Sequence, residues 1–450
     1  MMFFHQGVSA NPMSRLITVF GVVEEGHLHG DAWGAETIDK AIVHGHVYSD
    51  KAPLSSFLVI PLYAAWRHAH RNAPQAVYET AAVHIADVVV AALPFAIFAV
   101  LLRRRAAVYA SAGVASRIAL VSSFSTCLFN YGNIYFSHML SALLWVTAYV
   151  LAVDRGRCAL AGFVGGCGVL AEYPIALLDF ILACWLLGRR GSTWRRSAAF
   201  VMGATPPAIA MLGYNFAVTG RPFDFPYSHV TDTWQAMRVA FGVRLPSIEA
   251  EWELLFGQYR GLLFYAPTLA LFVPLALRKP SPGDFAPGDD LARARHRWLL
   301  LLALCSAQYL FVCSYFKWDG GWCTGPRHLA PVIALLVYEG AGKLARGWPR
   351  WRLAFYATGL MGIAINLAAA ATNPVPSESQ IHPLVQVFLP DLYAGHVNGH
   401  NLVAEAGLRS GTGIVGVWFL LFGAVLGILA IVDRSPSARL RARAPADHRG

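Results

Sequence analysis

The sequence predicts an all-α, polytopic integral membrane protein. Of its 450 residues, 56% are hydrophobic and only 14% are charged, and the mean hydropathy is +0.47. Soluble chains average about 25% charged residues. Polar sequence is confined to residues 1–75, 217–260, 278–297 and 373–412, each shorter than a typical domain of roughly 100–150 residues. A large soluble catalytic domain is therefore excluded.

Spanning helices need about 20 largely apolar residues. Eleven stretches fit or approach this requirement: 76–102, 108–129, 135–153, 158–172, 174–188, 197–217, 261–277, 298–316, 328–345, 353–372 and 413–432. They divide the chain into an outer segment, a helical bundle with three outer loops, and a basic tail. The respective ranges are 1–75, then 76–432 with loops 217–260, 317–327 and 373–412, then 433–450.

Lysine and arginine gather on one side of the predicted spans. Examples are Arg103–Arg105, the pair Arg189 and Arg190, the stretch 278–297, and the tail with Arg439. The positive-inside rule makes this side cytoplasmic and puts the C-terminus inside. The net charge of +10 and the pI near 9.4 therefore reflect topology and not nucleic-acid binding.

Eleven crossings with the C-terminus inside put residues 1–75 outside without a leader or a first span before them. We expect a twelve-span parent whose first helix precedes Met1; the alternative is an N-out protein inserted without a leader. Six of the seven cysteines lie in or beside predicted spans, so no structural disulfide is expected.

The outer segment carries two short apolar stretches. Leu16, Val19 and Phe20 recur at helical spacing behind Ser14, a predicted N-cap, and a second stretch runs over residues 53–66. Both are too short to cross a membrane, so we expect helices that lie along its surface. Between them lie acids and one lysine: Asp31, Glu36, Asp39, Asp50 and Lys51. Any one of these acids by itself is most simply a solvated loop residue.

Three more outer elements carry aromatic and polar residues. They span Phe129–His138, the long loop that ends at Tyr259-Arg260, and Lys317–His328. The third, KWDGGWCTGPRH, combines glycines with an Arg-His pair, an arrangement that exposes backbone amides and a guanidinium at a helix start. Arg260 and Arg327 stand on the side that the positive-inside rule disfavours. Phosphate binding would explain them, and snorkelling to lipid headgroups is the alternative.

These elements resemble a known family. The motifs SRLITVFGVVEEG, GHVYSDKAP, FNYG, GCGVLAEYP, GYNFAVTGRPF, YRGLLFYAP and GGWCTGPRHLAP are similar to those of bacterial GT-C superfamily glycosyltransferases, which are related to protein O-mannosyltransferases and the lipid A aminoarabinose transferase. The resemblance covers most of residues 11–332. It implies a polyprenyl-phosphate sugar donor, an acceptor hydroxyl on the outer face of the bacterial cytoplasmic membrane, and catalysis beneath the first outer loop. The first span and the usual Asp-Glu pair are absent; Ser14-Arg15 occupies that neighbourhood.

Glycosyl transfer from a phosphate to an alcohol needs a carboxylate to take the alcohol proton and donors to hold the departing phosphate. Asp39 and Asp50 are the candidate bases, because each precedes a lysine in the outer segment. Asp50 is slightly favoured, because Tyr48 and Pro53 frame it. The candidate phosphate ligands are Lys51, Arg260, Arg327, His328 and His138, and the candidate substrate-cavity residues are Tyr131, Tyr259, Trp318 and Asp319.

The expected partners are a polyprenyl-phosphate sugar, a lipid, glycan or protein acceptor, and membrane lipid. No cofactor is expected, although the pairs His27/His29 and His44/His46 are a possible divalent-metal site. A nucleotide is not expected either, because Gly162 and Gly166 lie within a span, where glycines indicate close helix packing.

Two other functions remain open. Asp87, Glu172 and Asp179 lie in or at the ends of predicted spans and should face the bundle interior, and such acids are also typical of a carrier or flippase of a lipid-linked or small solute. Transport leaves the charged outer segment unexplained. A lipid-linked glycan polymerase or ligase would share the donor chemistry with a single-sugar transferase.

Overall fold

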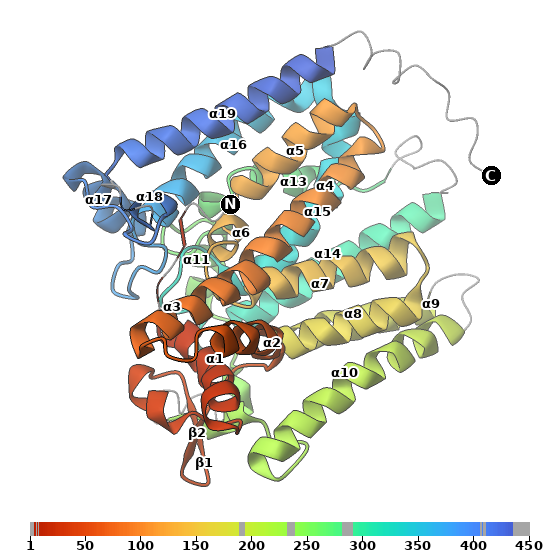
Figure 1. Cartoon of the computed structure of the whole chain (residues 1–450). Helices are drawn as coiled ribbons and strands as arrows, with labels where there is room; N and C mark the ends of the chain where they lie inside the picture. Colours follow the sequence, from red (N-terminus) through yellow and green to blue (C-terminus); the bar gives the residue numbers. More distant parts are fainter. Residues whose placement is uncertain are drawn as a thin grey trace.

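The computed structural model describes residues 4–5, 7, 9–188, 194–231, 239–280, 291–405, 407 and 411–434, and these form an almost entirely helical protein (Figure 1). The basic residues Arg189 and Arg190, much of the 278–297 stretch and nearly all of the 433–450 tail lie outside the described residues. The predicted all-α class is confirmed.

The helices follow one another along the whole chain. Their bounds are α1 Ala10–Phe20, α2 Leu54–Ala69, α3 Gln75–Ala86, η3 Asp87–Ala92, α4 Leu93–Ala107, α5 Ala112–Phe124, α6 Leu128–Tyr131, α7 His138–Tyr149, η4 Val150–Asp154, α8 Cys158–Ala171, α9 Ile175–Gly188, α10 Arg195–Thr219, α11 Ile248–Leu255, α12 Leu262–Tyr265, α13 Leu269–Leu277, α14 Leu291–Cys313, η8 Arg327–Leu329, α15 Ala330–Arg346, α16 Trp348–Ala371, α17 Leu389–Ala394, α18 Leu402–Glu405 and α19 Gly413–Arg434. Within the described ranges, the only two strands are β1 Ala41–Val43 and β2 His46–Tyr48. They form an antiparallel hairpin in which Ala41 pairs with Tyr48 and Val43 with His46.

Four helices are long and apolar enough to cross a membrane, judged by length and composition. They are the continuous helix Gln75–Ala107, then Leu291–Cys313, Trp348–Ala371 and Gly413–Ile431. Each of the other predicted stretches overlaps a helix, but α5, α8 and α9 are shorter apolar helices of 13 or 14 residues. The structure thus has the apolar helices of a membrane protein, whereas eleven crossings remain a prediction.

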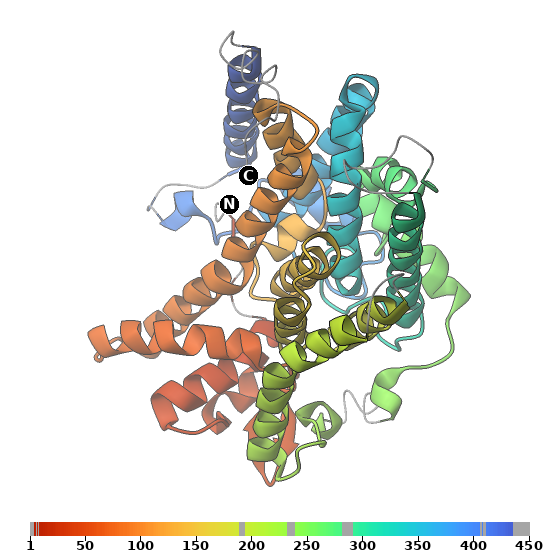
Figure 2. The same ribbon diagram turned by 90° about the vertical axis from the view of Figure 1, so that its right-hand side faces the viewer.

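Helices α1 and α2 and the hairpin lie together at one end of the bundle (Figures 1 and 2). The predicted second helix begins after Pro53 as expected, but the first begins at Ala10 with Ser9 as its N-cap. Ser14 is therefore inside α1, and its prediction as an N-cap was wrong. All residues from Pro12 to Phe20 are buried, so α1 does not lie on the surface with a solvated polar face. Its polar side chains are buried by segments that are distant in the sequence.

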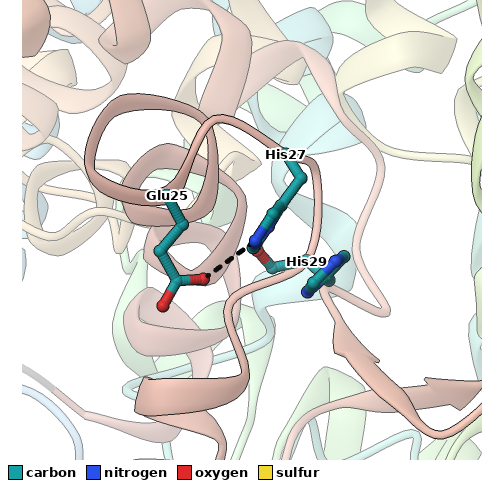
Figure 3. A group of neighbouring side chains, drawn as sticks. All are labelled: Glu25, His27 and His29. Atoms are coloured by element: carbon teal, nitrogen blue, oxygen red, sulfur yellow. Dashed lines mark hydrogen bonds and ion pairs between the residues drawn. The ribbon is translucent and has the colours of Figure 1, made fainter.

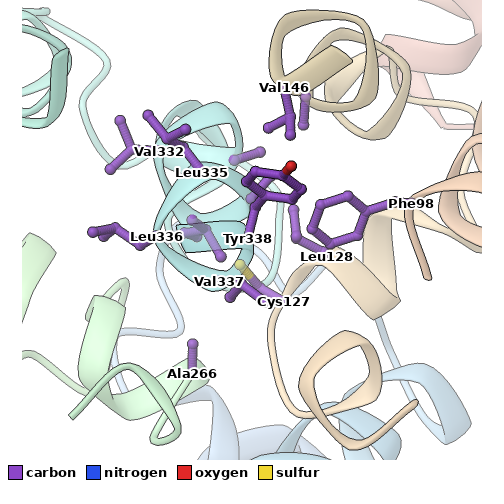
Figure 4. Close-up of a cluster of buried hydrophobic side chains, with 14 of the residues drawn as sticks. Phe98, Cys127, Leu128, Val146, Ala266, Val332, Leu335, Leu336, Val337 and Tyr338 are labelled. Carbon is purple, nitrogen blue, oxygen red and sulfur yellow. The ribbon is translucent and has the colours of Figure 1, made fainter. Parts of the chain in front are cut away.

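Helix α15 passes through the centre of the bundle. Nearly all of its residues are buried, and Leu335, Val337 and Tyr338 pack with Phe98 of α4 and Val146 of α7 (Figure 4). Between helices in lipid, close packing of such side chains holds the helices together, so α15 can act as a scaffold for the loop that precedes it.

Helices α8 and α10 pack backbone against backbone. A Cβ atom added to Gly162 would lie 1.8 Å from the carbonyl oxygen of Phe200, and one added to Gly203 would lie 1.8 Å from that of Ala159. The prediction that Gly162 serves close helix packing is confirmed. Asp87 and Asp179 are buried, as predicted for acids within the bundle, and all seven cysteines are free thiols.

Candidate functional site

The hairpin presents two carboxylates to one lysine. Asp39 precedes β1 and Asp50 follows β2, so the antiparallel pairing brings these residues together although eleven positions separate them. The Nζ atom of Lys51 lies 2.8 Å from Oδ2 of Asp50 and 3.2 Å from Oδ2 of Asp39. This is a buried ion triplet, in which one cation is shared by two anions.

The two carboxylates differ in the number of hydrogen bonds that they accept. Asp50 is fully buried, and its oxygens accept hydrogen bonds from the Ser14 hydroxyl at 2.7 Å and from Lys51. Asp39 has a side chain that is 13% exposed and is held on one oxygen only, by Lys51. The geometry therefore favours Asp39 as the carboxylate that can receive a proton, whereas the sequence slightly favours Asp50.

Charge fixes the ionisation of this group. Burial opposes the ionised form of Asp39, but the charge and hydrogen bond of Lys51, helped by Arg327 and Arg15, hold the pKa of Asp39 below its ordinary value. Burial likewise opposes the charge of Lys51, but Asp39 and Asp50 raise the pKa of the Lys51 ammonium. Lys51 and Asp39 thus stabilise the charged forms of each other.

A second ion pair lies beside the triplet. Arg15 on α1 is buried, and its Nη2 lies 3.1 Å from Oε1 of Glu172, which follows the last residue of α8. Its Nε donates to the hydroxyls of Ser137 at 2.9 Å and Ser55 at 3.2 Å. Nδ1 of His138 lies 3.6 Å from the same Glu172 oxygen. These contacts tie the outer segment to the ends of α7 and α8.

The Arg327-His328 pair lies next to these acids. The charge of Arg327 acts on Asp39, Glu172 and His138, and the ring of His328 lies edge-on to that of His138 at a centroid separation of 5.7 Å. Six of the predicted site residues are thus brought together, from four separate segments. They are Asp39, Asp50, Lys51, His138, Arg327 and His328.

Arg327 differs from the other buried cations in this group. Its guanidinium lies over the ring of Phe136 at 5.4 Å, its Nε is buried without a hydrogen-bond partner, and no carboxylate of the described residues lies within 4.0 Å of it. Buried guanidinium donors are costly when they have no acceptor. Arg327 is therefore the cation of this group that is available to an anion.

The ring of His328, like the guanidinium of Arg327, has a buried nitrogen without a hydrogen-bond partner among the described residues. It is hydrogen-bonded to the backbone of Lys317, while its Nε2 is buried and has no hydrogen-bond partner among the described residues. When Nδ1 carries the proton for the Lys317 carbonyl, Nε2 presents a lone pair.

Arg260 has a different environment from the one that phosphate binding requires. It is fully buried, and its donors go to three backbone carbonyls, those of Asp319, Tyr259 and Gly321, at 2.6, 2.9 and 2.6 Å. It also stacks on the Tyr259 ring at 3.8 Å. Arg260 therefore anchors the 317–327 loop by donating to the backbone carbonyls of Asp319 and Gly321.

The four residues predicted to line the substrate cavity also hold the 317–327 loop in place. The Tyr131 hydroxyl donates to the carbonyl of Thr324, and the Tyr259 hydroxyl donates to Oδ2 of Asp319 at 3.0 Å. Trp318 packs against the hydrophobic core. Tyr131, Tyr259, Trp318 and Asp319 thus hold the loop that positions Arg327.

Arg15 and Glu172 belong to the group but are missing from the residues predicted for the site. Sequence reasoning finds Glu172 as a costly acid at the end of a span, and such an acid needs a cationic partner. Arg15 lies in α1, within the outer segment. The pairing depends on contact between residues 157 positions apart, which no local pattern contains.

Comparisons with protein family models, curated proteins and solved structures find no match to this chain. The site is therefore interpreted from its own chemistry. In the described part of the chain, it combines Asp39, which contacts Lys51 through one oxygen, with Arg327 and His328, which each have one buried nitrogen without a hydrogen-bond partner. Such a set can accept a proton at one point and hold an anion at another.

Proposed function

We propose that the protein is a membrane glycosyltransferase, which moves a sugar from a polyprenyl-phosphate donor to an acceptor hydroxyl on the outer face of the bacterial cytoplasmic membrane. The observation that carries this proposal is the group in which Asp39 lies against Lys51 while the buried Nε of Arg327, close by, has no acceptor among the described residues. Proton removal from an alcohol and stabilisation of a departing phosphate are the two requirements of this reaction.

In this proposal Asp39 is the general base. It takes the proton of the acceptor hydroxyl as that oxygen forms a bond to the anomeric carbon, and the bond from this carbon to the phosphate oxygen breaks. The polyprenyl phosphate leaves with the bonding electrons, and Arg327 stabilises its charge. Lys51 keeps Asp39 ionised, and Asp50 orients Lys51.

The proposed topology has eleven crossings, a cytoplasmic C-terminus and the active site outside. The site is formed by the hairpin, η8 and the end of α8. In the proposed topology the cytoplasmic side is marked instead by Arg103–Arg105, in the last turns of α4, and by Arg155, which follows η4. The helices too short to span a bilayer of about 30 Å would be completed by their flanking turns and by local bilayer thinning. Membrane lipid is then a partner along the whole bundle.

A carrier or flippase is the second candidate, and one observation favours it. Asp179 on α9 is buried against Gly165 of α8, and its Oδ1 has no hydrogen-bond partner among the described residues. An acid of this kind could bind and release a proton during transport. A polymerase or ligase of lipid-linked glycans is a third candidate that shares the donor.

The deciding experiment uses the full-length protein, purified in detergent or placed in vesicles, with radiolabelled polyprenyl-phosphate sugars. We expect free polyprenyl phosphate to form only when an acceptor lipid, glycan or protein is added, with no dependence on a proton or sodium gradient. Glu251→Gln, on the separate helix α11, serves as a control with full activity. Gradient-driven movement of a solute without a new glycosidic bond would replace this proposal with the carrier.

A further inference from the structure

Five side chains that can ligate a metal lie together beside the outer hairpin. Glu25, His27 and His29 have ligand atoms within 4.8 Å of one another, and so do His29, Asp31 and His46. Figure 3 shows the first three, with the ring of His29 stacked beside that of His27. His29 belongs to both groups, so the five residues form one continuous cluster, separate from the site of Asp39 and Arg327.

The distances within the second group suit a small cation. Oδ2 of Asp31 lies 2.8 Å from Nδ1 of His46 and 3.2 Å from Nδ1 of His29. Two ligands of a tetrahedral zinc ion, each about 2.0–2.1 Å from the metal, are about 3.3–3.4 Å apart. Shifts of a few tenths of an ångström would therefore convert these contacts into coordination bonds.

The surrounding hydrogen bonds orient the ligands. The other oxygen of Asp31 accepts a hydrogen bond from the backbone N–H of Val47 at 2.6 Å. Nδ1 of His27 lies 2.8 Å from the carbonyl oxygen of His29, so Nδ1 donates to that oxygen and Nε2, which faces Glu25, is the nitrogen placed to ligate a metal. Metal-binding residues are commonly fixed by outer hydrogen bonds of this kind.

The three histidine rings are stacked on one another. Ring centroids are 3.5 Å apart for His27 and His29 and 4.1 Å apart for His29 and His46. The stack holds the rings in place beside the carboxylates of Glu25 and Asp31, so that nitrogen and oxygen ligands face one small volume.

We propose that His29, Asp31 and His46 bind one divalent transition-metal ion, with the Glu25–His27 pair beside them as the source of a fourth ligand. Imidazole nitrogen combined with carboxylate oxygen suits Zn²⁺, Ni²⁺ or Cu²⁺ and does not suit Mg²⁺ or Ca²⁺, which prefer oxygen ligands alone. The ion would join the loop after η1 (Gly21–Glu25) to β2, the strand that leads to Asp50.

The test measures binding and stability in the full-length protein after removal of metal with a chelator. We expect Zn²⁺ to bind at one ion per chain and to raise Tm, Mg²⁺ to do neither, and Co²⁺ to give the visible absorption of a nitrogen- and oxygen-ligated ion. His29→Ala and His46→Ala should each weaken Zn²⁺ binding at least about tenfold. The double variant His68→Ala with His70→Ala removes two other outer histidines and should bind as the parent does.

The metal-free variants must melt as the metal-free parent does, which checks their folding. His46 is on an exposed strand edge, and His46→Gln provides a second, polar replacement if the alanine variant fails that check. Zn²⁺ binding that survives both His29→Ala and His46→Gln, or that disappears in the His68/His70 double variant, would overturn the proposal. These readouts do not involve glycosyl transfer, so their outcome is independent of the proposed function.

Discussion

The Nζ atom of Lys51 lies 3.2 Å from Oδ2 of Asp39, although β1, the turn and β2 separate these residues along the chain. This contact, with the 2.8 Å contact to Asp50, makes Lys51 the centre of the outer site. Lys51 favours the ionised form of Asp39, and the Asp39 side chain is still partly exposed, so that a substrate could contact it. The predictions below test this relationship and the parts of the site around it.

Asp39→Asn should lower transfer by about 10²–10⁴-fold, the usual contribution of a general base, while Tm stays close to that of the parent. Asp50→Asn should instead lower Tm clearly, because it leaves Ser14 and Lys51 with a weaker acceptor in a fully buried position. Rate and thermal unfolding are measured on both variants, with Glu251→Gln as control. Full activity of Asp39→Asn would remove Asp39 as the base.

The pH profile of transfer should be flat on its acid side. A base is active when deprotonated, and because the folded pKa of Asp39 is lowered, activity should persist as the pH falls past the ordinary value of 3.8, as far as the fold survives. The stability that Asp39 contributes is likewise present above its unfolded pKa and lost only as the pH falls through the folded one.

Lys51→Met removes the charge and hydrogen bond but leaves the burial that opposes ionisation. The acid limb of the profile should therefore move to higher pH in this variant, by one unit or more. The measurement is kcat/KM against pH for the parent and the variant. An unmoved limb would show that another group sets the acid side.

Arg327→Lys and Arg260→Lys should have different effects, the first on donor binding and the second on the stability of the fold. Lysine keeps the charge but loses the planar fork, so Arg327→Lys should raise the donor KM while Tm is nearly unchanged. Arg260→Lys should lower Tm, because one ammonium cannot serve the carbonyls of Asp319, Tyr259 and Gly321 together. Parent-like donor use by Arg327→Lys would indicate that this arginine does not hold the phosphate.

Reporter fusions test the sidedness of the bundle. A reporter active only outside the cytoplasm should be active after Gly320 or Asn398 and inactive after Asp289, which lies outside the described residues. Gly320 and Asn398 belong to loops at the end of the bundle that carries the site. The reverse pattern would overturn the assignment of the outer face.

Gly162→Ala should destabilise the bundle, because the added Cβ would meet the backbone of α10 at 1.8 Å and force α8 away. Overpacking of this kind costs about 1–3 kcal/mol. Gly423→Ala on α19, where an added Cβ meets nothing within 4 Å, is the matched control and should keep or slightly raise Tm. Equal melting of the two variants would contradict the close contact between α8 and α10.

Local sequence patterns predicted much of the fold because helix formation and burial in an apolar environment are local properties. Apolar stretches marked most helices of the bundle, but residues 261–277 form two helices, α12 and α13, and α14 begins at Leu291, before the predicted start at 298; the glycine spacing marked the α8–α10 contact. The start of α1 was misplaced because Ser14 has the chemistry of an N-cap, yet its hydroxyl is used by Asp50 instead. Local propensity could not anticipate that competition.

By itself, then, the sequence determined the helical class and predicted Asp39, Asp50, Lys51 and the Arg327-His328 pair as candidate site residues. Only the tertiary structure decided what each of them faces. Arg260 and Arg327 look alike in sequence, but Arg260 donates to carbonyl oxygens, whereas the buried Nε of Arg327 has no acceptor among the described residues. Burial and hydrogen-bond partners set the chemistry of a charged side chain, and both are fixed by contacts between segments far apart in the chain.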